Sequence, residues 1–156
     1  MPDDTPHVPS ALAPIRALLL GAARDLLVAQ GSFPPFGAVQ HLDGRLALSA
    51  TYLHSTTASP ELHFSTLVDG LRSQRASLLA LGICSDIRAT PPCPSEATGA
   101  VQLNIEARDG LTVEAVVPYS LVQSGNVVFF PAFIRPATPL IFTSKRRWWP
   151  PWGAAT

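Results

Sequence analysis

Apolar residues in the first part of the chain recur at the spacing of a buried helix face. Between Ser10 and Gln30 they stand three or four positions apart, which is the period of one side of an α-helix. The stripe consists of Leu12, Ile15, Leu19, Ala22, Ala23, Leu26 and Leu27. Ser10 is of a type preferred at N-caps, and Gly31 stands where a left-handed glycine commonly ends a helix. The pattern predicts a helix from Ser10 to about Gln30.

A second helical stripe follows the triplet Ser59-Pro60-Glu61. The serine can cap a helix, the proline fits its first turn, and the carboxylate favours the positive end of the helix dipole. Apolar residues then recur at Phe64, Leu67, Val68, Leu71, Leu78 and Leu79. Gly82 offers a stop, so we expect a second helix between Ser59 and Gly82.

The clearest strand pattern lies in residues 101–117. Apolar and polar residues alternate on both sides of Asp109-Gly110, which predicts an antiparallel hairpin with one dry and one wet face. A two-residue loop would mix the two faces. A three-residue loop with a left-handed Gly110 sets Ala107 opposite Leu111 and keeps the dry face together, so we predict that register.

Shorter apolar runs predict the remaining strands. Residues 37–42 and 45–52 flank Asp43-Gly44, a pair typical of a type I′ hairpin turn. Residues 83–90 and 127–134 are further runs bounded by turn-forming residues. The whole pattern predicts an α+β fold: an antiparallel sheet of five or six strands with two amphipathic helices packed on one face, in the order α-β-β-α-β-β-β(-β).

Length and composition are those of one folded domain. The chain has 156 residues, of which 47% are hydrophobic and 14% charged, as is typical of globular proteins. We expect a single domain over residues 10–142. A proline-rich flexible tail, residues 1–9, precedes it, and a basic, tryptophan-rich tail, residues 143–156, follows it.

Charge and cysteine content narrow the function classes. Basic and acidic residues number 11 each, so no overall field steers the chain toward nucleic acid or an anionic membrane. The two cysteines match no metal-binding spacing, and the glycines match no nucleotide-binding loop, so no cofactor is expected.

The N-terminal segment and the residue usage suggest a compartment. The acidic start is unlike a signal peptide, and the apolar runs are short for a membrane span. Scarce lysine with abundant alanine and proline indicates a GC-rich bacterial genome. We predict a bacterial cytoplasmic protein with reduced thiols.

Three histidines are the candidate metal or acid–base residues. His41, His54 and His63 flank the predicted first hairpin and second helix, and packing could bring them together. None has the spacing of a known metal motif, so the alternative is that they lie apart on the surface. Cys84 could join such a site, but a cysteine that follows a helix end and begins a strand is expected to be a buried, inert thiol.

Charged residues on the predicted strands have two interpretations. Asp86 and Arg88 share a strand face, as an ion pair or a polar stripe. Glu106, Arg108 and Glu114 lie on the wet face of the second hairpin, where paired carboxylates could do glycosidase-type work. The ordinary interpretation is cross-strand pairing of glutamate with arginine. We predict no catalytic residue in either group.

The chain ends in a local concentration of cations and aromatic rings. Its members are Lys145, Arg146, Arg147, Trp148, Trp149 and Trp152. The mixture suits the groove of a protein partner, a membrane interface or single-stranded nucleic acid. The tryptophans could instead fold back over an open sheet edge or a helix.

Two resemblances bear on function. The segments GSFPPFGAV, GICSDIR and IEARDG, followed by Pro118-Tyr119, resemble an uncharacterised bacterial family with the pattern GxFxPFGA, GICxDxR, RDG and PY, over roughly residues 10–122. That family implies no activity and no site residues. The element order, with the hairpin residues Val39, Asp43, Gly44 and Ser49, is similar to roadblock-type domains, which are non-catalytic and dimerise through a helix and a sheet edge.

The sequence thus predicts a non-enzymatic protein-interaction module, scaffolding or regulatory, that pairs with itself as a homodimer. Open strands such as residues 127–130 need cover, and no catalytic constellation stands out. The alternative is a small enzyme or a ligand- or metal-binding protein that uses His41, His54, His63 and Cys84. A second alternative is membrane or nucleic-acid association through the C-terminal tail, against which the balanced charge argues.

Overall fold

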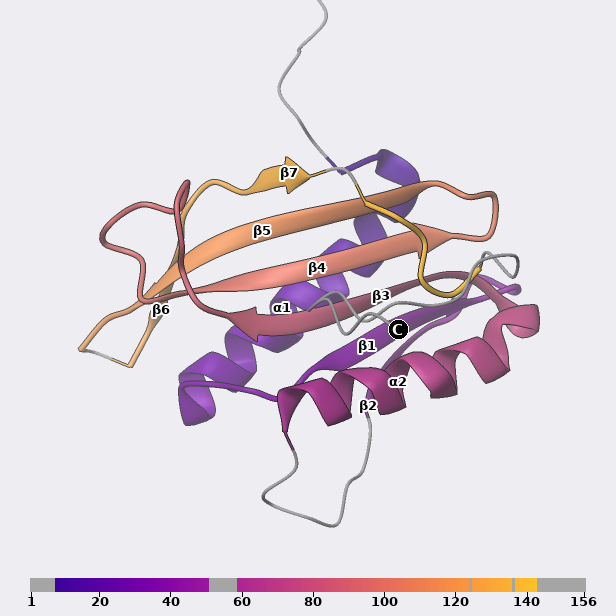
Figure 1. Ribbon diagram of the computed structural model, residues 1–156, viewed down its shortest axis with the longest axis horizontal. Helices are drawn as coiled ribbons and strands as arrows, with labels where there is room; N and C mark the ends of the chain where they lie inside the picture. Colours follow the sequence, from indigo (N-terminus) through magenta and orange to yellow (C-terminus); the bar gives the residue numbers. More distant parts are fainter. Residues whose placement is uncertain (1–7, 51–58, 124, 136, 143–156) are drawn as a thin grey trace, which may run out of the picture.

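The computed structural model describes residues 8–50, 59–123, 125–135 and 137–142, which form two helices and a curled antiparallel sheet (Figure 1). The helices are α1 (Ala13–Gln30), preceded by a 3-10 turn at Ser10–Leu12, and α2 (Pro60–Gln74), followed by a 3-10 turn at Arg75–Ser77. The strands are β1 (Phe36–His41), β2 (Leu46–Ala50), β3 (Leu78–Ile87), β4 (Gly99–Ala107), β5 (Thr112–Leu121), β6 (Val127–Phe129) and β7 (Phe133–Arg135).

Neighbouring strands are antiparallel in the order β2-β1-β3-β4-β5-β6, and β7 also pairs with β5. The α+β class and the predicted order of elements are confirmed, with β7 as one strand more than expected. The run over residues 127–134 is two short strands because Pro131, which has no N–H to donate, lies between them.

The two helices lie on opposite faces of the sheet, which corrects the prediction that both pack on one face (Figure 1). In β3, Leu81 and Ile83 belong to the apolar cluster that contains α2, whereas Ala80 and Cys84 belong to the cluster around α1. Because successive side chains on a strand point to opposite faces, β3 is apolar on both sides. The alternation of residues 101–117 had suggested a sheet with one wet face, but the central strands do not share it.

α1 ends as predicted but begins differently. Gly31 has a φ of 78°, and its N–H donates to Leu27 O at 2.9 Å, so it is a left-handed helix end. Ser10 does not cap the helix with its side chain, which corrects that prediction. The chain enters α1 through the 3-10 turn, in which Leu12 N–H donates to Pro9 O at 2.9 Å.

α2 begins as predicted and ends earlier. Leu62 N–H donates to Ser59 Oγ at 3.1 Å, so the serine caps the helix, and Pro60 is its first residue. The helix ends at Gln74 and not near Gly82, because the apolar run that starts at Leu78 belongs to β3. Because a short apolar run shows neither the helical nor the strand period clearly, the prediction placed Leu78 and Leu79 in the helix and not in the strand.

Gly82 lies in the middle of β3, where α1 crosses the sheet. A Cβ at this position would be 2.6 Å from Leu19 Cδ1 and 2.9 Å from Ile15 Cγ2, both on α1. Carbon atoms do not approach so closely, so any larger residue at this position would force these α1 side chains to shift. The residue predicted as a helix stop is therefore a packing residue.

Three hairpin turns use the same device, a glycine in the left-handed region whose N–H donates to the carbonyl three residues earlier. These glycines are Gly44, Gly110 and Gly125. The predicted register at Gly110 is confirmed, since Ala107 N–H donates to Leu111 O at 2.8 Å and Ile105 pairs with Val113. The type I′ turn predicted at Asp43-Gly44 is wrong, because among the described residues positive φ occurs only at glycines.

Candidate functional site

The structure does not bring His41 and His63 together. His41 ends β1 and pairs with Leu78 at the start of β3, whereas His63 lies near the start of α2. His63 and Gln74 are eleven positions apart on the helix, which alone separates them by about 16 Å along its axis. His54 lies outside the described residues, and within the described part of the chain no three His, Cys, Asp or Glu side chains are grouped to hold a metal ion.

Cys84 is a buried thiol, as predicted, although it lies inside β3 and not at its beginning. Burial raises the pKa of the Cys84 thiol well above its ordinary value, and the nearby Asp86 carboxylate raises it further. A thiol held protonated in the core is a poor nucleophile. Its surroundings therefore give Cys84 a packing role.

Asp86 is tied to Tyr119 and not to Arg88. The Tyr119 hydroxyl donates to Asp86 Oδ1 at 2.7 Å, while Arg88 lies beyond the end of β3. Partial burial raises the pKa of Asp86, and hydrogen bonds from Tyr119 and from the backbone of Phe33 oppose that rise. Burial and the Asp86 carboxylate together raise the pKa of Tyr119 strongly. The predicted ion pair with Arg88 is absent from the ion pairs of the described residues.

Gly99 makes room for this contact. It pairs with Tyr119 across β4 and β5, and a Cβ at Gly99 would be 2.4 Å from the Tyr119 hydroxyl oxygen. The hydroxyl therefore passes directly over the glycine to reach Asp86. The arrangement connects β3, β4 and β5 at one end of the sheet, so its role is structural.

Glu106 is buried, which corrects its predicted place on a wet face. Only 4% of the residue is exposed. Its Oε2 accepts a hydrogen bond from Leu140 N–H, and its Oε1 accepts from Ile141 N–H and Phe142 N–H, each at 2.8 Å. The carboxylate thus fixes the segment 140–142 over the sheet, beside the apolar cluster of α2. Charge-assisted bonds of this kind are among the stronger ones in proteins.

Arg108 and Glu114 have separate partners, so the predicted glutamate–arginine pairing across the hairpin is not formed. Arg108 Nε donates to Leu78 O at 3.0 Å, and its Nη2 donates to Arg75 O at 3.0 Å. A guanidinium at this place satisfies carbonyls at the end of α2, where positive charge is favourable. Glu114 accepts a hydrogen bond from the Gln102 amide. No signal in the sequence ties these residues to their partners, because the partners are backbone groups or lie on other strands.

The edge strand β2 is a feature that sequence analysis did not single out. β2 ends the strand order and, among the described residues, pairs only with β1. Leu46 and Leu48 are 43% and 54% exposed, and the neighbouring Leu42 is exposed as well. Apolar side chains on an open edge are a surface that can pair with another chain.

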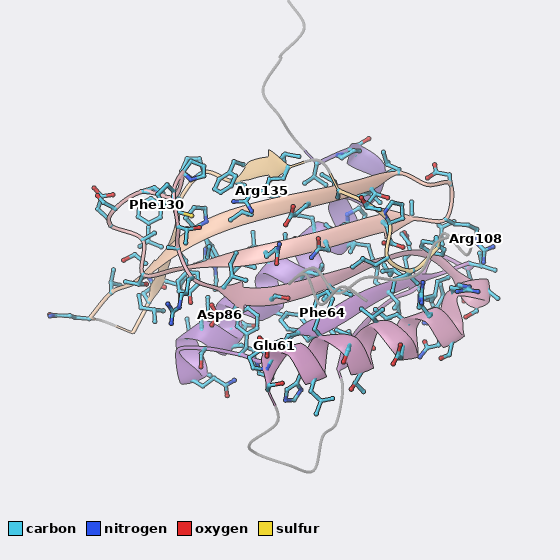
Figure 2. All side chains as sticks on the ribbon, in the orientation of Figure 1. Glu61, Phe64, Asp86, Arg108, Phe130 and Arg135 are labelled. Atoms are coloured by element: carbon cyan, nitrogen blue, oxygen red, sulfur yellow. The ribbon has the colours of Figure 1, made fainter. Side chains whose placement is uncertain are left out.

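A cavity of about 610 Å³ lies between the beginning of α2 and the end of β3. Pro60, Glu61 and Phe64 line it from α2, and Ser85 and Gln102 line it from the sheet. Figure 2 shows Glu61 and Phe64 on α2 beside Asp86 at the end of β3. The cavity contains neither His41 nor His63. Its lining combines apolar, uncharged polar and charged side chains.

The predicted interaction residues of the C-terminal tail, Lys145 to Trp152, lie outside the described residues. No helix in the described ranges is both long and apolar enough to cross a membrane. Comparison of the chain with protein-family models, with curated proteins and with solved structures gives no match. The resemblances to the uncharacterised bacterial family and to roadblock-type domains therefore stay predictions.

Proposed function

We propose that the chain is a non-enzymatic protein-interaction module of the bacterial cytoplasm that forms a homodimer by antiparallel pairing of β2 with β2 of a second copy. The observation that carries the proposal is the uncharged edge strand with exposed leucines. Free thiols at Cys84 and Cys93 agree with a reducing compartment.

The backbone of β2 is suited to such pairing. His41 N–H donates to Arg45 O at 2.8 Å, which marks this pair as hydrogen-bonded across the hairpin. Along an antiparallel strand, successive residues direct their backbone N–H and C=O groups alternately toward the partner strand and away from it. Leu46 and Leu48 therefore direct these groups away from β1. Within the described ranges, the β2 residues whose backbone groups have no partner strand are thus the ones with exposed apolar side chains.

The composition of β2 favours a second copy as the occupant. Strands at sheet edges are usually blunted by charge or proline, and the five residues from Leu46 to Ala50 contain neither. A two-fold axis through the edge would place this uncharged strand against itself, with no like charges opposed. The chain as a whole has a net charge of zero, so the two copies do not repel each other.

The opposite edge of the sheet is protected. β6 and β7 have three residues each and are separated by Pro131. Arg24 of α1 covers part of this edge, because its guanidinium lies 4.8 Å from the ring centre of Phe129 and its Nη1 donates to Val127 O at 3.3 Å. Of the two edges, β2 is therefore the one that offers a pairing surface.

The test is the mass of the full chain by sedimentation velocity over a range of concentrations. We expect a dimer for the natural chain and a monomer for the double variant Leu46→Lys, Leu48→Lys, because two cations would then face two others across the axis. Leu62→Lys is the matched control, since Leu62 is 49% exposed but lies on α2, and it should remain dimeric.

Two results would overturn the proposal. One is a natural chain that stays monomeric at every micromolar concentration tested. The other is a dimer that survives the double β2 variant and disappears when residues 143–156 are deleted, which would assign the association to the tail.

A further inference from the structure

The cavity between α2 and β3 has a floor made by two neighbouring polar side chains. Ser85 on β3 pairs directly with Gln102 on β4, so their side chains leave the same face of the sheet next to each other. Both line the cavity. The floor therefore presents a hydroxyl and a carboxamide within reach of one ligand group.

Ser85 has an unused hydrogen-bonding group. The residue is 7% exposed, and its Oγ has no hydrogen-bond partner in the described part of the protein. A buried hydroxyl without a partner costs free energy, so most native ones are satisfied. On β3 the side chain of Ser85 shares the face of Ile83, which is the side on which Phe64 of α2 packs. Ser85 is thus directed to the cavity with a free donor and acceptor.

The orientation of the Gln102 amide is fixed by its neighbour. Its Nε2 donates to Glu114 Oε1, and a carboxylate accepts only from the nitrogen side of an amide. The Oε1 of Gln102 therefore stays available as an acceptor. The floor offers a donor at Ser85 next to an acceptor at Gln102, which is the complement of a carboxamide or lactam edge.

Part of the cavity lining is apolar. Pro35, Pro60, Phe64 and Ile87 line it, and such side chains pack well against a planar ring. The charged residues of the lining are Glu61, Asp86 and Arg88, so acidic groups outnumber the single cation and disfavour an anionic ligand. The Asp86 carboxyl is already engaged by Tyr119, and the Ser85–Gln102 pair is the uncharged polar anchor of the cavity.

We propose that this cavity binds a small, uncharged, planar ligand through a carboxamide or lactam group. The carbonyl of the ligand accepts from Ser85 Oγ–H, its N–H donates to Gln102 Oε1, and its ring lies against Phe64 and the prolines. The site is remote in sequence from the β2 edge, and this inference does not depend on the proposed dimer.

The first test uses benzamide as the probe, with ligand-observed saturation-transfer NMR on the full chain. A ligand of this size is expected to bind with a Kd on the order of 1 mM. N,N-dimethylbenzamide, which lacks the donor, and benzoate, which is an anion, should bind roughly tenfold more weakly. No binding of benzamide, or equal binding of all three probes, would overturn the proposal.

The second test is the variant Ser85→Ala. This change removes a hydroxyl without a partner, so the variant should fold with an unchanged or raised thermal midpoint, while benzamide affinity falls roughly tenfold. Ser73→Ala is the matched control, because Ser73 lies on the exposed surface near the other end of α2 and donates to Gly70 O. If a folded Ser85→Ala chain binds benzamide as tightly as the natural chain, Ser85 is not the donor to the ligand. If the variant does not fold, the comparison of the three probes on the natural chain still tests the proposal.

Discussion

The two faces of the sheet bury different kinds of side chain. The face under α1 is apolar from β1 to β5, with residues such as Ala38, Cys84, Leu103 and Ala115 packed against the helix. The face under α2 is apolar over β1 and β3, but its continuation over β4 and β5 carries polar residues. These are Gln102, Asn104, Glu106 and Glu114. The first face packs mainly apolar side chains, with the Asp86–Tyr119 hydrogen bond at one end, whereas the second holds groups that bind other segments and line the cavity.

The two faces therefore contribute differently to the fold: the α1 face to its overall stability, and the α2 face to the choice of one arrangement of the chain. An apolar layer contributes free energy in proportion to the area it buries and is sensitive to volume. A buried polar group contributes only when its partners are in place, and so it selects one arrangement of the chain. Substitutions on the α1 face should therefore cost global stability, and those on the α2 face should act on particular segments.

The largest effect is expected where α1 touches the sheet. Gly82→Ala places a methyl group against Leu19 and Ile15 on the α1 face, at distances that force one of them to move. We expect a loss of about 3 kcal/mol in the free energy of unfolding, measured by urea denaturation. Gly37→Ala is the control on the other face. Its Cβ would lie 3.1 Å from Gly82 O and 3.6 Å from Leu67 Cδ1, and the expected loss is about 1 kcal/mol. Equal losses at the two glycines would contradict the comparison.

The next effect concerns the segment fixed by Glu106. Glu106→Ala removes the acceptor of three backbone N–H groups, so we expect the free energy of unfolding to fall by about 2 kcal/mol. Hydrogen exchange should accelerate at Ile141 and Phe142 while the α1 face stays protected. Glu106→Gln keeps one acceptor oxygen and should lose about half as much.

Glu114→Ala serves as the control for Glu106. Glu114 lies on the same face but is only half-buried, and its hydrogen bond comes from a side chain and not from segment 140–142. Its removal should leave exchange at Ile141 unchanged. If both variants released the segment equally, Glu106 would not be its anchor.

The features that the sequence predicted are those governed by local rules. The caps at Gly31 and Ser59 and the three-residue loop at Gly110 follow from backbone geometry and near neighbours. The α+β class and the order of elements along the chain follow from the periods of apolar residues. The inertness of Cys84 was also predicted, because a cysteine at the beginning of a strand lacks the helix N-terminus that lowers the pKa of a thiol.

The features that the sequence did not predict depend on contacts far along the chain. Gly82 was interpreted as a helix stop, yet its role is set by Leu19, more than sixty positions earlier. Glu106 occupies a polar position in a regular alternation of apolar and polar residues. It is buried only because the segment 140–142 covers it. The Ser85–Gln102 floor likewise requires the register of two strands, which a single strand pattern does not supply.

Arg108 should give a moderate effect, because it joins the β4–β5 turn to the end of α2. Arg108→Ala leaves several carbonyls without this donor, and we expect a loss of about 1 kcal/mol by thermal or urea unfolding. Arg45→Ala is the control, since Arg45 is exposed and pairs with Asp43 within its own hairpin. Surface pairs of that kind contribute roughly 0 to 1 kcal/mol. If Arg45→Ala lowers the free energy of unfolding more than Arg108→Ala does, Arg108 does not hold the end of α2 as proposed.

The smallest effect is a pH dependence at Asp86, on the α1 side of the sheet. Because partial burial raises the pKa of Asp86 above its ordinary 3.8, the folded chain holds this proton to a higher pH than the unfolded chain does. Between those two pKa values the folded state binds more protons, so this group lowers the free energy of unfolding as pH rises.

Asp86→Asn removes that decline, while its amide oxygen can still accept from Tyr119. The stability of the variant relative to the natural chain should therefore increase from below pH 3.8 to neutral pH, as measured by urea unfolding at each pH. Asp69→Asn, an exposed change on α2 with the same loss of charge, is the control. A stability difference at Asp86 that stays constant or shrinks over this range would show that burial on the α1 face does not penalise the charged carboxylate.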